Sequence, residues 1–329
     1  MREPGLAAPA GASGPSLPEH VRSFLDATRD AAFPASALQD EDVACEWLAR
    51  ARRRKPARTH VEPVREVREG RVPGGPAVRL YIPRLGRPLP TLLFFHGGGW
   101  VLGDLDSNDA ICRRLANQGE VLVVSVDYRL APEYPFPAAL DDVVAAYAWV
   151  RAGIDRFGGD PARIAVAGSS AGANLAAALT LRLRDVGSEQ PSLQMLLYPP
   201  LEARADSPSH RRNATGYSLH HDQMRWFWQA YAPGSPDQPL VSPAYCVDLG
   251  GLAPAYVVTA EFDPLHDEGC AYADRLKMAG VPVELDDVAA QIHGFLNLVG
   301  AWPEADAAAA RAAKALRARF EDGATISAY

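Results

Sequence analysis

The 329-residue sequence has few cysteines, no long apolar run and no excess of positive charge. Its four cysteines stand far apart and form neither a CxxC pair nor a recognisable Cys/His metal motif, so we expect reduced thiols and no metal site. A formal net charge of −7 repels a polyphosphate backbone and argues against a nucleic-acid partner.

No segment approaches the ~18 consecutive apolar residues that a membrane span needs. The first twenty residues contain no apolar stretch typical of a signal peptide, and we therefore expect a cytoplasmic protein. Hydrophobic residues make up 48% of the chain and charged residues 22%, which is ordinary for a globular protein. The length suits one α/β domain that carries a lid.

Hydrophobic periodicity divides the chain into strands and helices. Short apolar or alternating runs predict strands at 61–69, 77–83, 91–95, 121–128, 163–168, 194–199, 255–261 and 281–288. Spacings of three and four residues predict helices at 139–153, 171–185, 269–280 and 304–320. Strands that alternate with helices predict an α/β fold with a mostly parallel sheet covered on both faces.

Three segments fall outside this alternation. Residues 1–17 are rich in Gly, Pro, Ala and Ser and are predicted to be a disordered tail. Residues 18–58 have a helical pattern that Pro56 should end, and residues 203–235 are polar and then strongly aromatic. We expect these two segments to form a helical cap over a core of residues 59–202 and 236–323.

A candidate nucleophile lies where the fifth predicted strand meets a helix. Residues 168–172 read GSSAG and fit the G-x-S-x-G elbow, in which Ser170 sits on a strained turn. Small neighbours are needed because strand and helix approach closely there. The following helix N-terminus favours developing negative charge, so Ser170 is predicted to be the catalytic nucleophile.

Three consecutive glycines follow the buried run TLLFF. Gly97, Gly98 and Gly99 can turn their backbone N–H groups toward a ligand, which the tetrahedral intermediate of acyl transfer requires. The preceding His96 is a tempting base, but its place beside this loop favours a structural role in which it hydrogen-bonds the loop backbone.

A serine nucleophile needs a base, and the base needs an orienting acid. The chain order serine, acid, histidine of this fold selects His293, which follows the last predicted strand. Asp263 follows the strand at 255–261 and is the predicted acid, with Glu261 and Asp267 as fallbacks. His266 also follows the serine, but it stands only three residues after the candidate acid.

Taken together, these residues resemble the hormone-sensitive lipase-like esterases, bacterial family IV of the α/β-hydrolase superfamily. The resemblance covers about residues 60–300 and rests on HGGGW at 96–100, DYRLAPEYPFPAALDD at 127–142, GSSAGANLAAA at 168–178, DPLHDEG at 263–269 and HGF at 293–295. It implies a cofactor-independent carboxylesterase with a two-part lid. It also implies an oxyanion hole made by the N–H groups of Gly98, Gly99 and Ala171, with Gly97 as a further candidate, and a structural role for the YRLAPE segment.

Three positions depart from the family pattern. Ser169 stands where the family usually has Asp, Asn108 where it frequently has His, and Ala173 where it usually has Gly. The loss of the aspartate removes a negative charge next to the nucleophile. None of the three departures removes a member of the predicted triad, so activity is still expected.

Bulky aromatic residues surround the predicted site in sequence. Trp100 in the glycine loop and Trp226 and Phe227 in the cap insertion are predicted to narrow the acyl pocket, which would favour short acyl chains. The alternative is that the cap aromatics, with Trp228 and Tyr231, only pack the cap on the core.

The motifs leave other functions open. A triad of this kind also serves amide, thioester and carbamate hydrolysis and acyl transfer in biosynthesis, since all pass through an acyl-serine. A ligand-binding relative without catalysis is a further alternative, but such relatives tend to lose the catalytic histidine. The resemblance also implies that a homodimer, formed through an edge strand or helix, is common among relatives.

Overall fold

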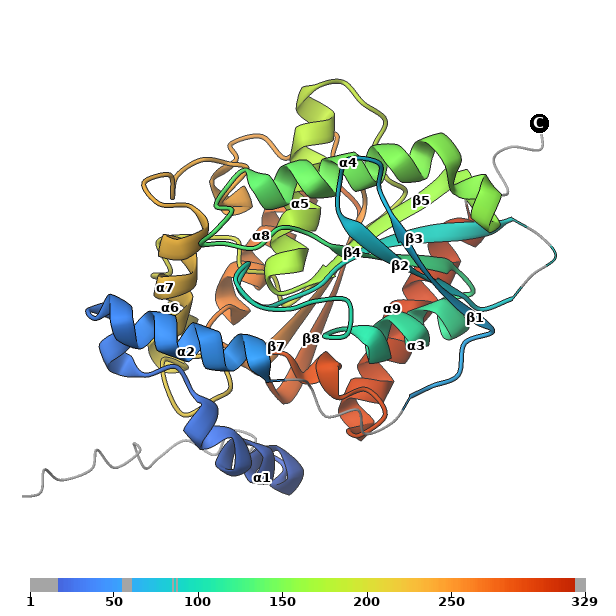
Figure 1. Cartoon of the computed structure of the whole chain (residues 1–329). Helices are drawn as coiled ribbons and strands as arrows, with labels where there is room; N and C mark the ends of the chain where they lie inside the picture. The colour runs from blue at the N-terminus through green and yellow to red at the C-terminus, as the bar shows by residue number, and fades with distance from the viewer. Residues whose placement is uncertain (1–16, 55–60, 85, 87, 323–329) are drawn as a thin grey trace, which may run out of the picture.

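The computed structural model describes residues 17–54, 61–84, 86 and 88–322. The predicted tail, apart from Leu17, and the helix stop at Pro56 therefore lie outside the described residues. One eight-stranded sheet forms the centre of the molecule, with the strand order β1-β2-β4-β3-β5-β6-β7-β8 (Figure 1). β2 is antiparallel to both β1 and β4, and all other neighbours are parallel. The strands are β1 (Glu66–Arg71), β2 (Ala77–Ile82), β3 (Leu89–Phe95), β4 (Leu122–Asp127), β5 (Gly159–Ser169), β6 (Gln194–Leu197), β7 (Ala255–Phe262) and β8 (Val283–Ile292).

Helices cover both faces of the sheet, as predicted. α3 (Asp109–Gly119) and α9 (Pro303–Asp322) pack together on one face, and α4 (Ala138–Gly153), α5 (Ala171–Asp185) and α8 (His266–Met278) cover the other. Short 3-10 helices connect these elements at η3 (Ile154–Phe157), η4 (Pro243–Tyr245) and η5 (Phe295–Leu298). None of the described helices combines the length and hydrophobicity needed to cross a membrane.

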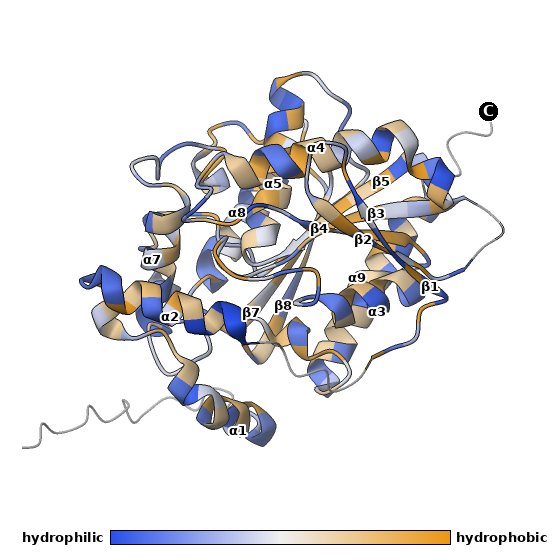
Figure 2. Cartoon of the chain, viewed as in Figure 1, coloured by the Kyte–Doolittle hydropathy of each residue, from blue (hydrophilic) through white to orange (hydrophobic). Residues whose placement is uncertain are grey.

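The strand β3 shows why an apolar run forms the middle of the sheet. Leu92 and Phe94 point into the core beneath α3 and α9, whereas Leu93 and Phe95 point into the core beneath α4 and α5. Because side chains alternate across a strand, a sheet covered on both faces needs apolar residues at every position. Figure 2 shows this as hydrophobic colouring along the central strands.

Both predicted cap segments contain helices joined by turns and loops. The first contains α1 (Glu19–Thr28), η1 (Arg29–Ala31), η2 (Ala35–Leu38) and α2 (Glu41–Arg53), and the second contains α6 (Pro208–Arg212) and α7 (His221–Tyr231). They meet through aromatic rings, since Phe33 and Trp47 both contact Trp226, with ring centroids 5.6 and 5.8 Å away. The division of the chain into cap and core stays a prediction.

Two differences from the predicted elements bear on the candidate site. α3 follows the glycine loop, where no helix is predicted, and it begins at Asp109. β8 runs to Ile292 rather than ending at residue 288, because a register shift between Ala260 and Phe262 lets its last residues pair with β7. Ala290 lies at this irregularity with φ 57°, and its N–H donates to Glu261 Oε2 at 2.7 Å.

All four cysteines are unpaired, as predicted. Cys112 and Cys246 are buried, Cys45 is exposed and Cys270 is half-buried. Buried thiols of this kind act as small apolar side chains.

Candidate active site

Ser170 lies on a sharp turn between β5 and α5. It has φ 52° and ψ −121°, an uncommon backbone conformation for a residue with a side chain. A Cβ atom on Gly172 would lie 2.0 Å from the Phe95 carbonyl oxygen, and one on Gly168 would lie 2.2 Å from the Gly172 carbonyl carbon. The glycines of the GSSAG motif are therefore required by the close approach of strand and helix, which was the steric reason for predicting an elbow here.

The structure brings Ser170, His293 and Asp263 together. His293 Nε2 lies 2.9 Å from Ser170 Oγ, and His293 Nδ1 lies 2.6 Å from Asp263 Oδ2. The three side chains follow the carboxyl ends of β5, β8 and β7, which meet at one edge of a parallel sheet. Asp263 is fully buried and His293 is 12% exposed, so the carboxylate is shielded while the imidazole reaches the cavity.

Backbone contacts fix the acid and the base. The Leu265 N–H donates to the second carboxylate oxygen of Asp263 at 2.9 Å. From the predicted cap, Asn213 Nδ2 donates to the Asp263 carbonyl at 3.0 Å, and Ser218 Oγ donates to the His293 carbonyl at 2.7 Å. Asn213 and Ser218 were not singled out in the sequence, because a side chain that binds distant backbone leaves no local pattern.

The fallback residues lie elsewhere. Glu261 binds the backbone of β8, and Asp267 accepts from His266 Nδ1 at 2.7 Å and pairs with Arg212 at 3.0 Å. Neither Glu261 nor Asp267 forms a hydrogen bond with His293, and Asp263 does.

The glycine loop presents free donors at the end of β3. The N–H groups of Gly98, Gly99 and Ala171 donate to no acceptor among the described residues. The Gly97 N–H differs from these three, because it donates to Asn108 Oδ1 at 3.0 Å, and its part in the oxyanion hole stays a prediction. Gly98 and Gly99 have φ 124° and 59°, a backbone region that favours glycine.

Asn108 connects the glycine loop to the nucleophile elbow. Its side-chain oxygen also accepts from Ser169 Oγ at 3.2 Å, and its amide donates to Asn297 Oδ1 at 2.7 Å. Asn108 is 4% exposed. Two of the three departures from the family pattern, Asn108 and Ser169, are therefore direct neighbours in one buried hydrogen-bond network.

His96 has the structural role that its position predicts. Its Nδ1 donates to the Gly97 carbonyl at 2.9 Å, and its ring stacks on Tyr128 with centroids 4.2 Å apart. The Tyr128 hydroxyl donates to the His96 carbonyl at 2.8 Å, so the YRLAPE segment supports the glycine loop from below. Complete burial lowers the pKa of His96 to about 4, which keeps the ring neutral at pH 7.

A cavity of about 400 Å³ opens over the Ser170 hydroxyl. Phe227 of α7 lines it and packs so closely on the glycine loop that a Cβ atom on Gly99 would lie 2.2 Å from the ring. The other two predicted pocket residues do not line the cavity. Trp100 is fully buried and stacks on Tyr231 at 4.4 Å. Trp226 points to the ring cluster of Phe33 and Trp47.

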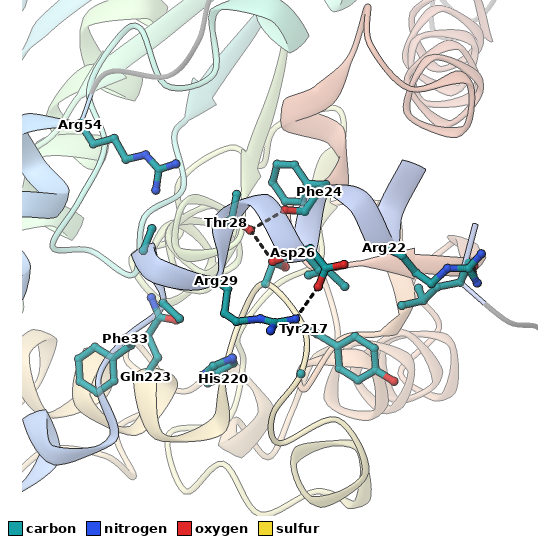
Figure 3. A pocket seen from close by; sticks show the side chains of 16 residues that line it. Arg22, Phe24, Asp26, Thr28, Arg29, Phe33, Arg54, Tyr217, His220 and Gln223 are labelled. Carbon is teal, nitrogen blue, oxygen red and sulfur yellow. Dashed lines mark hydrogen bonds and ion pairs between the residues drawn. The ribbon is translucent and has the colours of Figure 1, made fainter. Parts of the chain in front are cut away.

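A second cavity of about 650 Å³ adjoins the first one beneath α1 (Figure 3). The two cavities share four lining residues, which are Phe24, Arg54, Ser218 and Gln223. Figure 3 labels Arg54 in the lining of this second cavity, and no dashed line joins its guanidinium to the other residues drawn.

Comparison with known proteins agrees with this architecture. The family profile of the alpha/beta hydrolase fold matches residues 92–297. The chain is 43% identical to carboxylesterase NlhH of Mycobacterium tuberculosis over 73% of this chain and 77% of that protein. It is 40% identical to an ethyl acetate hydrolase of Pseudomonas putida, over 70% and 74% of the two chains. The crystal structure of a hyperthermophilic esterase from the archaeon Pyrobaculum calidifontis superposes with a TM-score of 0.81 at 37% identity, over 92% of this chain and 98% of the other.

An eight-stranded, mostly parallel sheet with a serine elbow at its carboxyl edge defines an α/β-hydrolase. The chain belongs to the α/β-hydrolase fold family, and its resemblance to the hormone-sensitive lipase-like esterases is confirmed.

Proposed function

We propose that this protein is a serine carboxylesterase that hydrolyses small esters with short acyl groups through an acyl-serine intermediate. One observation carries the proposal: His293 bridges the Ser170 hydroxyl at 2.9 Å and the buried Asp263 carboxylate at 2.6 Å. The esterase names of the relatives, at 40–43% identity over most of the chain, support the same class of reaction.

The first half-reaction forms the acyl-enzyme. His293 Nε2 accepts the Ser170 proton as Oγ attacks the ester carbonyl, and it then delivers that proton to the leaving alcohol. Asp263 keeps the proton of the neutral ring on Nδ1 and stabilises the imidazolium that forms. In the second half-reaction His293 activates water, which releases the acid from Ser170.

The oxyanion is bound by backbone donors. We assign this role to the N–H groups of Gly98, Gly99 and Ala171, which have no other acceptor among the described residues. The dipole of α5, whose first residue is Ala171, adds to their field. Each such donor typically contributes a factor of about 10²–10³ in turnover.

The volume over Ser170 supports a small acyl group. The cavity of about 400 Å³ is narrowed by Phe227, which lies on the glycine loop, so we place the acyl chain against this ring. The adjoining cavity of about 650 Å³ gives the alcohol portion more room. A series of p-nitrophenyl esters should therefore show highest kcat/KM at short acyl length, and a maximum at long chains would contradict the assignment.

The central experiment compares the wild type with Ser170→Ala. The wild type should hydrolyse p-nitrophenyl acetate and react with a fluorophosphonate probe, and Ser170→Ala should lose both by several orders of magnitude. Ser169→Ala is the comparison variant: it removes the adjacent hydroxyl of the same elbow but keeps the nucleophile, so it should still be labelled, although more slowly than the wild type. Labelling of Ser170→Ala at the wild-type rate would refute the nucleophile.

A further inference from the structure

A second cluster of reactive side chains lies outside the active-site cavity, where α8 packs on β7 and β8. His266 Nε2, Cys270 Sγ and an Asp287 carboxylate oxygen all lie within 4.8 Å of one another. His266 and Cys270 are four residues apart on α8, so they share one helix face, and Asp287 comes from β8. The mechanism proposed for ester hydrolysis uses none of the three.

We propose that His266, Cys270 and Asp287 form a binding site for a single Zn²⁺ ion. A tetrahedral zinc centre has Zn–N and Zn–O bonds of about 2.0–2.2 Å and Zn–S bonds of about 2.3 Å, so its ligand atoms are about 3.4–3.6 Å apart. Here His266 Nε2 lies 3.1 Å from Asp287 Oδ1 and 3.9 Å from Cys270 Sγ. The third separation, from Cys270 Sγ to Asp287, is at most 4.8 Å, so small side-chain movements suffice for the three atoms to converge on one small cation.

The surroundings of the cluster are those of a metal centre. His266 Nδ1 is 2.7 Å from Asp267 Oδ1, and a carboxylate on the remote nitrogen directs the other nitrogen toward a metal. Thr259 Oγ1 donates to Asp287 Oδ1 at 2.8 Å and fixes the carboxylate. The Cys270 thiol donates to the same Thr259 hydroxyl at 3.8 Å, so each of the three protein ligands has a neighbour that orients it.

The donor set and exposure favour zinc over harder cations. Imidazole, thiolate and one carboxylate form a borderline-soft set, whereas Mg²⁺ and Ca²⁺ prefer oxygen ligands alone. The side chains of His266 and Asp287 are 19% and 50% exposed, so an ion can enter and water can complete the coordination. The sequence predicts no metal site because its cysteines form no CxxC or Cys/His motif. His266 and Cys270 lie one helical turn apart on α8, and that spacing is not part of such a motif.

A bound ion would connect two elements that lie next to catalytic side chains in the chain. α8 begins three residues after Asp263, and β8 ends one residue before His293. Zinc would therefore stabilise the carboxyl edge of the sheet without entering the active-site cavity, and the expected effect is on stability. Binding to the folded state alone raises the melting temperature as the free zinc concentration exceeds Kd.

Cobalt provides a direct test, because Co²⁺ substitutes for Zn²⁺ and a bound thiolate gives a sulfur-to-cobalt charge-transfer band in the near ultraviolet. The untagged wild type, stripped with a chelator and kept reduced, is titrated with Co²⁺ and then with competing Zn²⁺. We expect a charge-transfer band that saturates at one equivalent and disappears as zinc replaces cobalt. Zinc should also raise the melting temperature of the wild type.

Variants locate the site. Cys270→Ser should abolish the band, His266→Gln should weaken cobalt binding at least about tenfold, and Cys45→Ser, which removes an exposed thiol elsewhere, should leave the band unchanged. Absence of the band in the folded wild type, or its persistence in Cys270→Ser, would overturn the proposal. The cluster would then be only a histidine hydrogen-bonded between two carboxylates. Circular dichroism of each variant establishes that it is folded, and none of these readouts depends on esterase activity.

Discussion

The Ser169 hydroxyl donates a hydrogen bond to Asn108 Oδ1 at 3.2 Å, and the same oxygen accepts the Gly97 N–H at 3.0 Å. The residue before the nucleophile is thereby connected to the first glycine of the loop that faces it. Both Ser169 and Asn108 differ from the usual family residues, Asp and His. Their contact indicates that the two differences form one unit that sets the position of the glycine loop.

This contact predicts coupled effects in a double-mutant cycle. Asn108→Leu should reduce kcat by roughly tenfold or more with a smaller change in KM, because the loop donors act mainly on the oxyanion in the transition state. Ser169→Ala and the double variant complete the cycle. Residues in contact typically show coupling energies of ~0.5–3 kcal/mol.

Two controls separate positioning from general damage in this cycle. Melting temperatures should show that the variants remain folded at the assay temperature. Asn108→Leu combined with Asn117→Leu, a distant change near the end of α3, should give additive effects. If the effects of Ser169→Ala and Asn108→Leu on kcat were also additive, the hydrogen bond between the nucleophile elbow and the glycine loop would not couple the two.

Asp263 should be necessary for turnover and not for folding. Asp263→Asn preserves shape but cannot hold the imidazole in the required tautomer, so we expect kcat to fall by about 10³–10⁴. Glu261→Gln is the matched control from the end of the same strand, and it should remain within a few-fold of wild type. Steady-state kinetics with a p-nitrophenyl ester measure both variants, and equal losses would remove Asp263 from its assigned role.

Phe227 should limit acyl length and Trp226 should not. Phe227 lines the cavity over Ser170, whereas the neighbouring Trp226 packs on Phe33 and Trp47. Phe227→Ala is expected to move the optimum of kcat/KM to longer acyl chains. Trp226→Ala removes a half-buried ring, so it should lower the free energy of unfolding by less than the ~3–5 kcal/mol typical of a fully buried ring, without moving the optimum. An unchanged optimum in Phe227→Ala would place the acyl pocket elsewhere.

The burial of His96 should make the folded protein less stable in acid. Burial lowers its pKa from 6.5 to about 4, so the unfolded chain binds a proton between these values and the folded chain does not. The free energy of unfolding should therefore be highest above pH 6.5 and fall as the pH approaches 4, by on the order of 3 kcal/mol from this group. Urea unfolding between pH 7 and 4.5 tests this, and His96→Asn should give a shallower decrease. The same slope in both proteins would assign the acid sensitivity to other groups.

The sequence alone was sufficient for the fold and for the order of the candidate triad. Hydrophobic periodicity and short apolar runs depend only on residues that are close together in the sequence. The strands at 91–95 and 255–261 are predicted because burial on both faces of a sheet requires mostly apolar runs. Ser170, Asp263 and His293 each come after a predicted strand, so their shared place at the carboxyl edge follows from chain order in a parallel sheet. The need for small residues at Gly168 and Gly172 could also be predicted, because both belong to the five-residue motif around Ser170.

Only the tertiary structure decided which groups face each other. Whether the Gly97 N–H is free depends on Asn108, which reaches it from the start of α3, a helix that local periodicity did not reveal. Trp100 and Trp226 are as bulky as Phe227, but packing directs only Phe227 into the cavity. The His266, Cys270 and Asp287 cluster likewise joins a helix to a strand. Periodicity reports how a segment is buried, whereas side-chain partners depend on how distant segments pack in three dimensions.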